Sequence, residues 1–201
     1  MSDSVMLPPA AVVIGVRVAD FDAWKTVFDA NERDRIDNGV LGHHINRAEG
    51  DPNRVDVYLA VGDAEKARRW VGSEALKELM ASAGVLGAPV VNWMTPVRES
   101  IVWDRELPAM IVTHRVEDFD GWLAGYDAAD GLQRSGGIIG HAANRSIDDP
   151  EIAVVYHQAE SFETLRSFLG SDQLRSAMKE AGVVSEPEIT FHTGGWAKHY
   201  T

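Results

Sequence analysis

Three histidines in the second half of the chain are the side chains best suited to chemistry. His114, His157 and His192 stand where the first half, 98 positions earlier, has the apolar residues Val16, Leu59 and Met94. Imidazole exchanges protons near neutral pH, so each could act as a general base toward an activated C–H or a phenol. Their concentration in one half predicts a polar pocket there and a structural role for the first half. For any single histidine, the competing interpretation is a strand residue with a satisfied hydrogen bond.

The constant offset comes from an internal duplication. From Arg17/Arg115 to Thr95/Thr193 the halves align without a gap over 79 positions, of which 28 are identical. An apolar run closed by Asp-Phe-Asp-x-Trp occupies residues 12–24 and again 110–122. Solenoids and propellers need several short repeats, so two long copies predict two globular modules.

The start of each copy predicts a strand followed by a helix. In the first copy, residues 11–18 are apolar and rich in β-branched side chains, which favours a buried strand. Asp20 then precedes apolar residues spaced by three and four, and its carboxylate is suited to cap a helix. Gly39 tolerates the positive φ that often ends a helix.

The rest of each copy predicts a hairpin, a second helix and a last strand. Residues 40–48 and 54–61 are joined by turn-forming residues around an Asp-Pro pair. A helical pattern over residues 64–83 is interrupted at Gly72-Ser73, and residues 89–95 follow as a strand. The order βαββαβ is the ferredoxin-like arrangement, so the predicted fold class is α+β with two tandem modules and antiparallel sheets.

The two modules are expected to pack together within one chain. Both helices on one face leave the other face of a four-stranded sheet bare, and a second copy can cover it. We predict an N-terminal module at 10–96, a connector at 97–108 and a C-terminal module at 109–201. A chain that pairs its own sheets can be a monomer, and a homodimer through leftover edges is the alternative.

Side-chain alternation along strands distributes the histidines between two faces. His192 shares a face with Glu188 and Thr190, which directs it away from the helices. His114 shares a face with Met110, Val112 and Val116, and His157 shares one with Val155, both of which suit the helix side. Alternation leaves open which face lines a cavity.

Four other residues of the second half are candidates for substrate binding. Trp122, His141, Arg145 and Tyr156 each have an identical counterpart in the first half. Arg145 could hold a carboxylate, phenolate or enolate through its paired donors. The favoured alternative for Arg145 is an ion pair with Asp148 or Asp149, since presence in both copies indicates structure. Tryptophan on a helix face is by default a core residue.

Other kinds of chemistry find little support in the sequence. There are no cysteines, which excludes disulfides and thiolate sites, and Gly-x-Ser-x-Gly is absent. Seven histidines are present, but none forms a metal-binding pair at ligand spacing. His43 and His44 are adjacent and point to opposite faces of a strand. We therefore expect no cofactor and no metal; the alternatives are a metal site assembled from several strands and a haem held by one axial histidine.

Composition narrows the partners. The chain is 45% hydrophobic and 25% charged, as in an ordinary globular protein, and its formal net charge of −12 disfavours nucleic acid and anionic membranes. No apolar run approaches the roughly 20 residues that span a bilayer, and the start of the sequence lacks the basic residues of a signal peptide. The expected location is the cytoplasm.

The shared motifs resemble a known group of proteins. Val-x-Asp-Phe-Asp-x-Trp is followed in each half by Gly-(Val/Ile)-(Leu/Ile)-Gly-His, Asn-Arg, Asp-Pro, Gly-Ser and Ala-Gly-Val-x-x-x-Pro. This series is similar to that of the dimeric α+β barrel group, which includes antibiotic biosynthesis monooxygenase-like proteins, related cyclases and isomerases, and haem-dependent relatives. The resemblance implies an intrachain version of that barrel. In the cofactor-free monooxygenases of the group, a cavity between helices and sheet holds an aromatic polyketide.

Two functions follow as hypotheses. The first is a cofactor-independent monooxygenase, cyclase or isomerase that acts on a small apolar or aromatic substrate in the second module, with His114, His157 or His192 moving a proton. The second is a non-catalytic ligand-binding or stress-associated protein, because no complete catalytic set can be named. Replacing the histidines by apolar residues would separate them.

Overall fold

Two copies of one βαββαβ succession make up the protein. The computed structural model describes residues 7–200. The first copy contains β1 (Ala10–Val18), α1 (Phe21–Ala30), α2 (Glu32–Asp37), β2 (Val40–Ala48), β3 (Asp51–Val61), α3 (Ala64–Val71), α4 (Glu74–Ser82) and β4 (Val85–Ser100). The second contains β5 (Leu107–Arg115), α5 (Phe119–Ala128), α6 (Asp130–Ser135), β6 (Gly140–Ser146), β7 (Ile152–Gln158), α7 (Phe162–Leu169), α8 (Asp172–Glu180) and β8 (Glu188–His199). The predicted α+β class with two ferredoxin-like modules is confirmed.

The chain divides into two compact units whose limits differ from those of the repeats. The first unit contains residues 8–93 and the segment from 194 onward, and the second contains residues 94–193 together with Leu7. The predicted modules, 10–96 and 109–201, follow the sequence duplication instead. The difference arises because β4 and β8 are long, so that each ends in the other unit.

The sheet of each unit has the same strand order. In the first unit, β3 lies between β1 and β2, β4 borders β1, and the end of β8 borders β2. In the second unit, β7 lies between β5 and β6, the start of β8 borders β5, and the end of β4 pairs with β6. Residues 97–100 of the predicted connector therefore belong to β4. The packing of the two sheets against each other stays a prediction.

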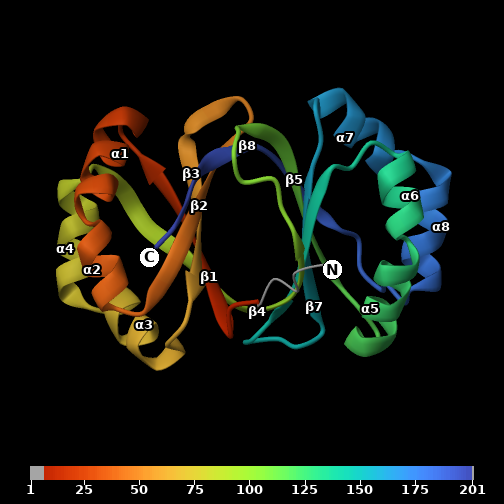
Figure 1. Cartoon of the computed structure of the whole chain (residues 1–201), viewed down its shortest axis with the longest axis horizontal. Helices are drawn as coiled ribbons and strands as arrows, with labels where there is room; N and C mark the ends of the chain where they lie inside the picture. Colours follow the sequence, from red (N-terminus) through yellow and green to blue (C-terminus); the bar gives the residue numbers. More distant parts are fainter. Residues whose placement is uncertain (1–6, 201) are drawn as a thin grey trace. The chain divides into compact units, whose positions relative to one another are not determined.

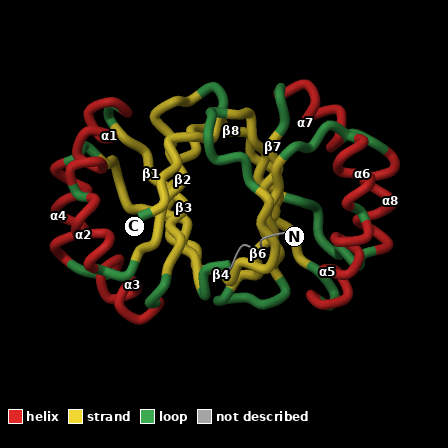
Figure 2. The backbone as a smooth tube through the Cα atoms, viewed as in Figure 1, coloured by secondary structure: helices red, strands yellow, loops and turns green. Residues whose placement is uncertain are grey.

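Helices cover one face of the sheet in each unit, as Figures 1 and 2 show. Buried apolar side chains cluster between the helices and the sheet in each unit. In the first unit these include Val12, Ile14, Phe21 and Trp24, and in the second Met110, Val112, Phe119 and Trp122. Each unit therefore has its own hydrophobic core beneath its own helices.

Local signals fix the helix ends where the sequence predicted them. The Asp20 carboxylate accepts a hydrogen bond from the Ala23 N–H at 2.8 Å, and Ser73 accepts one from Leu76 at 3.2 Å, which restarts the helix after the break. Gly39 and Gly137 both have a φ of 84°, which glycine tolerates best. The predicted long helices are thus pairs of shorter ones.

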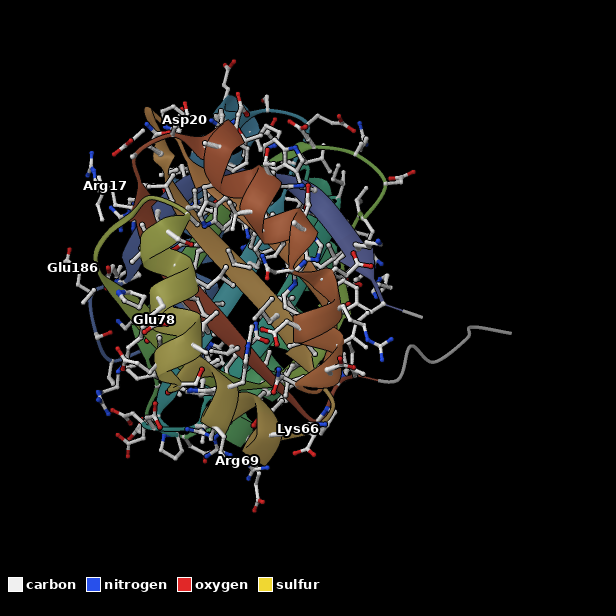
Figure 3. The ribbon with its side chains drawn as sticks, turned by 90° about the vertical axis from the view of Figure 1, so that its left-hand side faces the viewer. Arg17, Asp20, Lys66, Arg69, Glu78 and Glu186 are labelled. Carbon is white, nitrogen blue, oxygen red and sulfur yellow. The ribbon has the colours of Figure 1, made fainter. Side chains whose placement is uncertain are left out.

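Charged residues on the outer surface of the first unit point into solvent. Figure 3 shows Lys66, Arg69 and Glu78 projecting outward from α3 and α4, with Asp20 beside the start of α1. All four are exposed. Within residues 7–200, no helix is both long and apolar enough to cross a bilayer.

Candidate functional site

A cavity lies between the sheet and the helices of the second unit. β5 and β7 supply its floor, and α5 to α8 supply its walls. The space open to the centre of a water molecule is about 60 Å³, which suits a few waters or one small organic molecule. Apart from His114, His157, Gln133 and the Tyr126 hydroxyl, the lining side chains are apolar.

Small residues on the helices make room for this cavity. Gly125, Ala129 and Ala177 line it, and at an offset of 98 the first half has Val27, Asn31 and Leu79. Phe168 likewise replaces the larger Trp70. Each exchange removes volume above the sheet of the second unit, so the duplicated fold is retained while its interior is opened.

His114 and His157 enter the cavity from adjacent strands. Both are buried, with 5% and 6% of their surfaces exposed. The His114 ring lies 5.6 Å from the centroid of Trp122, and the His157 ring lies 5.6 Å from that of Phe168. None of their four ring nitrogens has a hydrogen-bond partner among residues 7–200. Buried polar atoms are normally paired, so these nitrogens indicate a site that a ligand or water completes.

Burial keeps both imidazoles neutral at physiological pH. Loss of solvation lowers the pKa of His114 to about 4. Burial lowers the pKa of His157 to about 3, and the nearby His141 and His114 act in the same direction. A neutral imidazole has one donor and one acceptor, so the two rings together carry two unpaired donors and two unpaired acceptors.

His192 lies outside the cavity. It is fully buried on the face of β8 opposite Ile189 and Phe191, which pack in the core of the second unit. Its Nε2 lies 2.8 Å from the Thr190 Oγ1. The predicted set of three histidines therefore divides into two cavity residues and one residue on the other face, as the alternation of side chains along β8 indicated.

The predicted substrate-binding residues also lie at different places relative to the cavity. Trp122 lines the cavity, and the Nδ1 of His141 lies 2.7 Å from the hydroxyl of Tyr126, a lining residue. Tyr156 precedes His157 on β7 and therefore points to the opposite face of that strand. Tyr126 thus links the half-buried His141 to the cavity wall.

Arg145 has a structural place outside the cavity. Its Nε donates a hydrogen bond to the Pro150 carbonyl at 2.9 Å, and its guanidinium lies 4.7 Å from the centroid of the Phe119 ring. The expected ion pair with Asp148 or Asp149 does not form within residues 7–200, where Arg145 makes these two contacts and Asp149 pairs with Arg115. Arg47 repeats the same two contacts in the first unit, with the Pro52 carbonyl and the Phe21 ring.

Sequence reasoning missed Tyr126 and Gln133. Gln133 is 3% exposed and lines the cavity beside Tyr126, and its Oε1 has no partner among residues 7–200. Burial raises the pKa of Tyr126, so its hydroxyl keeps its proton. The signal was available, since the first half has Phe28 and Arg35 at these positions, but the comparison of the halves was confined to strands.

The first unit fills the equivalent region with its own side chains. Arg35, 3% exposed, donates through Nε to the Tyr200 hydroxyl at 2.5 Å and through Nη1 to the Phe28 carbonyl at 2.6 Å. Its guanidinium lies 3.7 Å from the centroid of the Phe28 ring. The Tyr200 hydroxyl lies 2.7 Å from the Nδ1 of His43. Both units therefore give this histidine a tyrosine partner, from different places in the chain.

The polar groups of the cavity are hydrogen-bonding side chains. Within the part of the chain that the structure describes, no three side chains of the metal-binding kinds come together. What the site offers is neutral donors and acceptors in apolar surroundings.

Comparison with known proteins supports the fold. No family model matches the sequence, and no curated protein matches it. A crystal structure of a candidate monooxygenase from Lactobacillus acidophilus is similar with a TM-score of 0.68 at 11% identity, covering 96% of each chain. An anthrone oxidase-like protein gives 0.67 at 10% identity, covering 94% of this chain and 92% of its own. A ferredoxin-fold protein related to antibiotic biosynthesis monooxygenases, from Listeria monocytogenes, gives 0.54 at 8% identity, covering 92% and 94%. The predicted resemblance is confirmed at the level of fold.

Proposed function

We propose that the second unit is a cofactor-independent enzyme of the monooxygenase or cyclase kind, acting on a small apolar or aromatic molecule in its cavity. One observation carries this proposal: His114 and His157 line the cavity, and their four ring nitrogens have no partner among residues 7–200. Similarity to an anthrone oxidase-like protein agrees with it, because that name implies a weakly acidic aromatic substrate.

His114 or His157 would act as the general base. A buried imidazole with a low pKa accepts a proton only if a negative charge forms beside it, and a phenolate or enolate supplies that charge. The proton moves to the ring nitrogen and the electron pair stays on the substrate. In an oxygenase reaction dioxygen is the oxidant: a CH₂ group becomes a carbonyl, and the second oxygen atom leaves as water.

Oxygen uptake tests the proposal. The protein is offered a panel of phenols and of aromatic ketones with activated C–H groups, while oxygen consumption and products are measured. We expect turnover of at least one compound, lowered about 100-fold by His114→Val or His157→Leu, each of which introduces the first-half residue. The control His192→Met also introduces the first-half residue, but at a position outside the cavity. Its turnover should stay within about twofold of the wild-type turnover. Turnover insensitive to the two cavity variants would overturn the role of the histidines.

Ligand binding without turnover is the second candidate. It is favoured by the absence of any carboxylate from the cavity lining, since catalytic histidines are usually oriented by such a group. In this case compounds bind, the same variants weaken binding, and bound compounds are recovered unchanged under air. Recovery of an oxidised or cyclised product would exclude it.

A further inference from the structure

Gln133 carries a hydrogen-bond acceptor that the protein itself does not use. We propose that Gln133 determines specificity: its Oε1 selects an uncharged ligand that presents an O–H or N–H group to α6. This inference rests on the proposed function only in requiring that the cavity bind a ligand. Beyond the proposed function, it states which hydrogen-bonding group the ligand carries and which residue binds that group.

Gln133 lies in the cavity wall beside a tyrosine–histidine contact. The Tyr126 hydroxyl lies 2.7 Å from the His141 Nδ1, to which it can donate. The nearby Gln133 amide acts to lower the pKa of Tyr126. Gln133 itself lines the cavity, and its buried Oε1 has no partner among residues 7–200. An oxygen can only accept from a ligand donor.

The lining of the cavity argues against a charged ligand. No Lys, Arg, Asp or Glu contributes to it, and His114 and His157 are neutral at physiological pH. A carboxylate would enter without a counter-ion and would place its lone pairs against Oε1, and both effects disfavour its binding. A hydroxyl or N–H group instead satisfies Oε1 and leaves the imidazoles to bind a second polar group.

The first unit shows that the fold does not require this acceptor. At the same position Arg35 has donors only, and two of its nitrogens are satisfied by the Tyr200 hydroxyl and the Phe28 carbonyl. The second unit retains the tyrosine–histidine contact with a glutamine in place of the arginine. The acceptor beside the cavity therefore belongs to a residue that the second unit does not share with the first.

Three probes that share one aromatic ring test this inference. Phenol, toluene and benzoate share one ring and differ in a single group, which is a donor, a methyl or an anion. Dissociation constants are measured by ligand-observed NMR for the wild type, for Gln133→Met, which has similar length and no acceptor, and for Gln173→Met, an exposed control on α8. Ala177→Leu, which introduces the first-half residue, fills the cavity and shows whether binding occurs there.

In the wild type we expect the phenol-to-toluene affinity ratio to exceed that of Gln133→Met by about tenfold, the value of one net hydrogen bond. Benzoate should bind weakest, and Gln173→Met should match the wild type. If both phenol and toluene bind with a ratio that Gln133→Met leaves unchanged, the role of Gln133 is overturned and the proposed function stands. Wild-type preference for benzoate would also overturn it without any variant. If no probe binds to the wild type or to Ala177→Leu, the cavity does not bind these ligands and both proposals fail.

Discussion

The two units have one fold and two kinds of interior. In the first, large side chains, the buried Arg35 and the returning Tyr200 fill the region between helices and sheet. In the second, small helix residues leave a cavity, and two unpaired histidines replace apolar strand residues. The second copy thus buries two unpaired histidines at positions where the first copy packs Val16 and Leu59. The difference between copies is thus a better guide to function than what they share.

Exchanging the residues at the His157 position gives the largest expected effect. Leu59→His places a polar ring in a packed core and should lower the free energy of unfolding by about 3 kcal/mol or more. The reverse exchange, His157→Leu, removes unpaired polar atoms and should raise it by about 1 kcal/mol. Chemical denaturation measures both, and destabilisation by His157→Leu would show that its nitrogens are paired within the fold.

Acid should unfold the protein through its buried histidines. His43, His44 and His114 have a folded pKa of about 4 and His157 of about 3, against an ordinary value of 6.5. Between these values the unfolded chain binds protons that the folded chain cannot. The free energy of unfolding is therefore highest above pH 6.5. It falls as the pH drops toward 4, and each histidine contributes to this loss a free energy on the order of a few kcal/mol.

The double variant His114→Val/His157→Leu sharpens this expectation. It removes His114 and His157, which both lie in the second unit, and leaves His43 and His44 in the first. Urea midpoints measured at several pH values from 7.5 to 4 should decline less steeply than in the wild type. Parallel declines would mean that His114 and His157 titrate normally in the folded protein.

The two tyrosine–histidine pairs should differ moderately in how much each contributes to the free energy of unfolding. Tyr200→Phe removes the hydroxyl that joins Arg35 to His43, and a hydrogen bond to a charged donor contributes about 1.5–3 kcal/mol. Tyr126→Phe removes only neutral partners, His141 and Gln133, and should cost about 1 kcal/mol. Thermal or urea unfolding of both variants shows which loses more stability. A larger loss for Tyr126→Phe would contradict the expectation that the charged Arg35 strengthens the Tyr200 hydrogen bond.

His192 provides the smallest expected effect. His192→Met introduces the residue of the first half at a position outside the cavity, so the affinity for any cavity ligand should remain within about twofold. Isothermal titration with a ligand found in the oxygen-uptake panel checks this. A tenfold loss would place His192 in contact with the ligand and merge the two faces of the sheet into one site.

Much of this arrangement could be predicted from the repeat. The alternation of Ile189, Thr190 and Phe191 around His192 was enough to direct it away from the helices, and that of Met110, Val112 and His114 was compatible with the helix side. The extent of β4 and β8 was not predictable, because pairing with a strand far along the chain leaves no local pattern. Gln133 was missed since its role depends on Tyr126, and contact between successive helices is not visible in strand alternation.

The long last strand has a consequence for how the protein is made. Residues 94–193 form a unit inserted between the two parts of the other, and residues 194–199 of β8 cover the outer edge of β2. A ribosome releases the inserted unit before it releases those residues. During translation the edge of β2 in the first unit therefore stays unpaired until residues 194–199 have been synthesised. An unpaired β-edge is prone to wrong pairing with other strands. The same late segment brings Tyr200 to its place in the first unit.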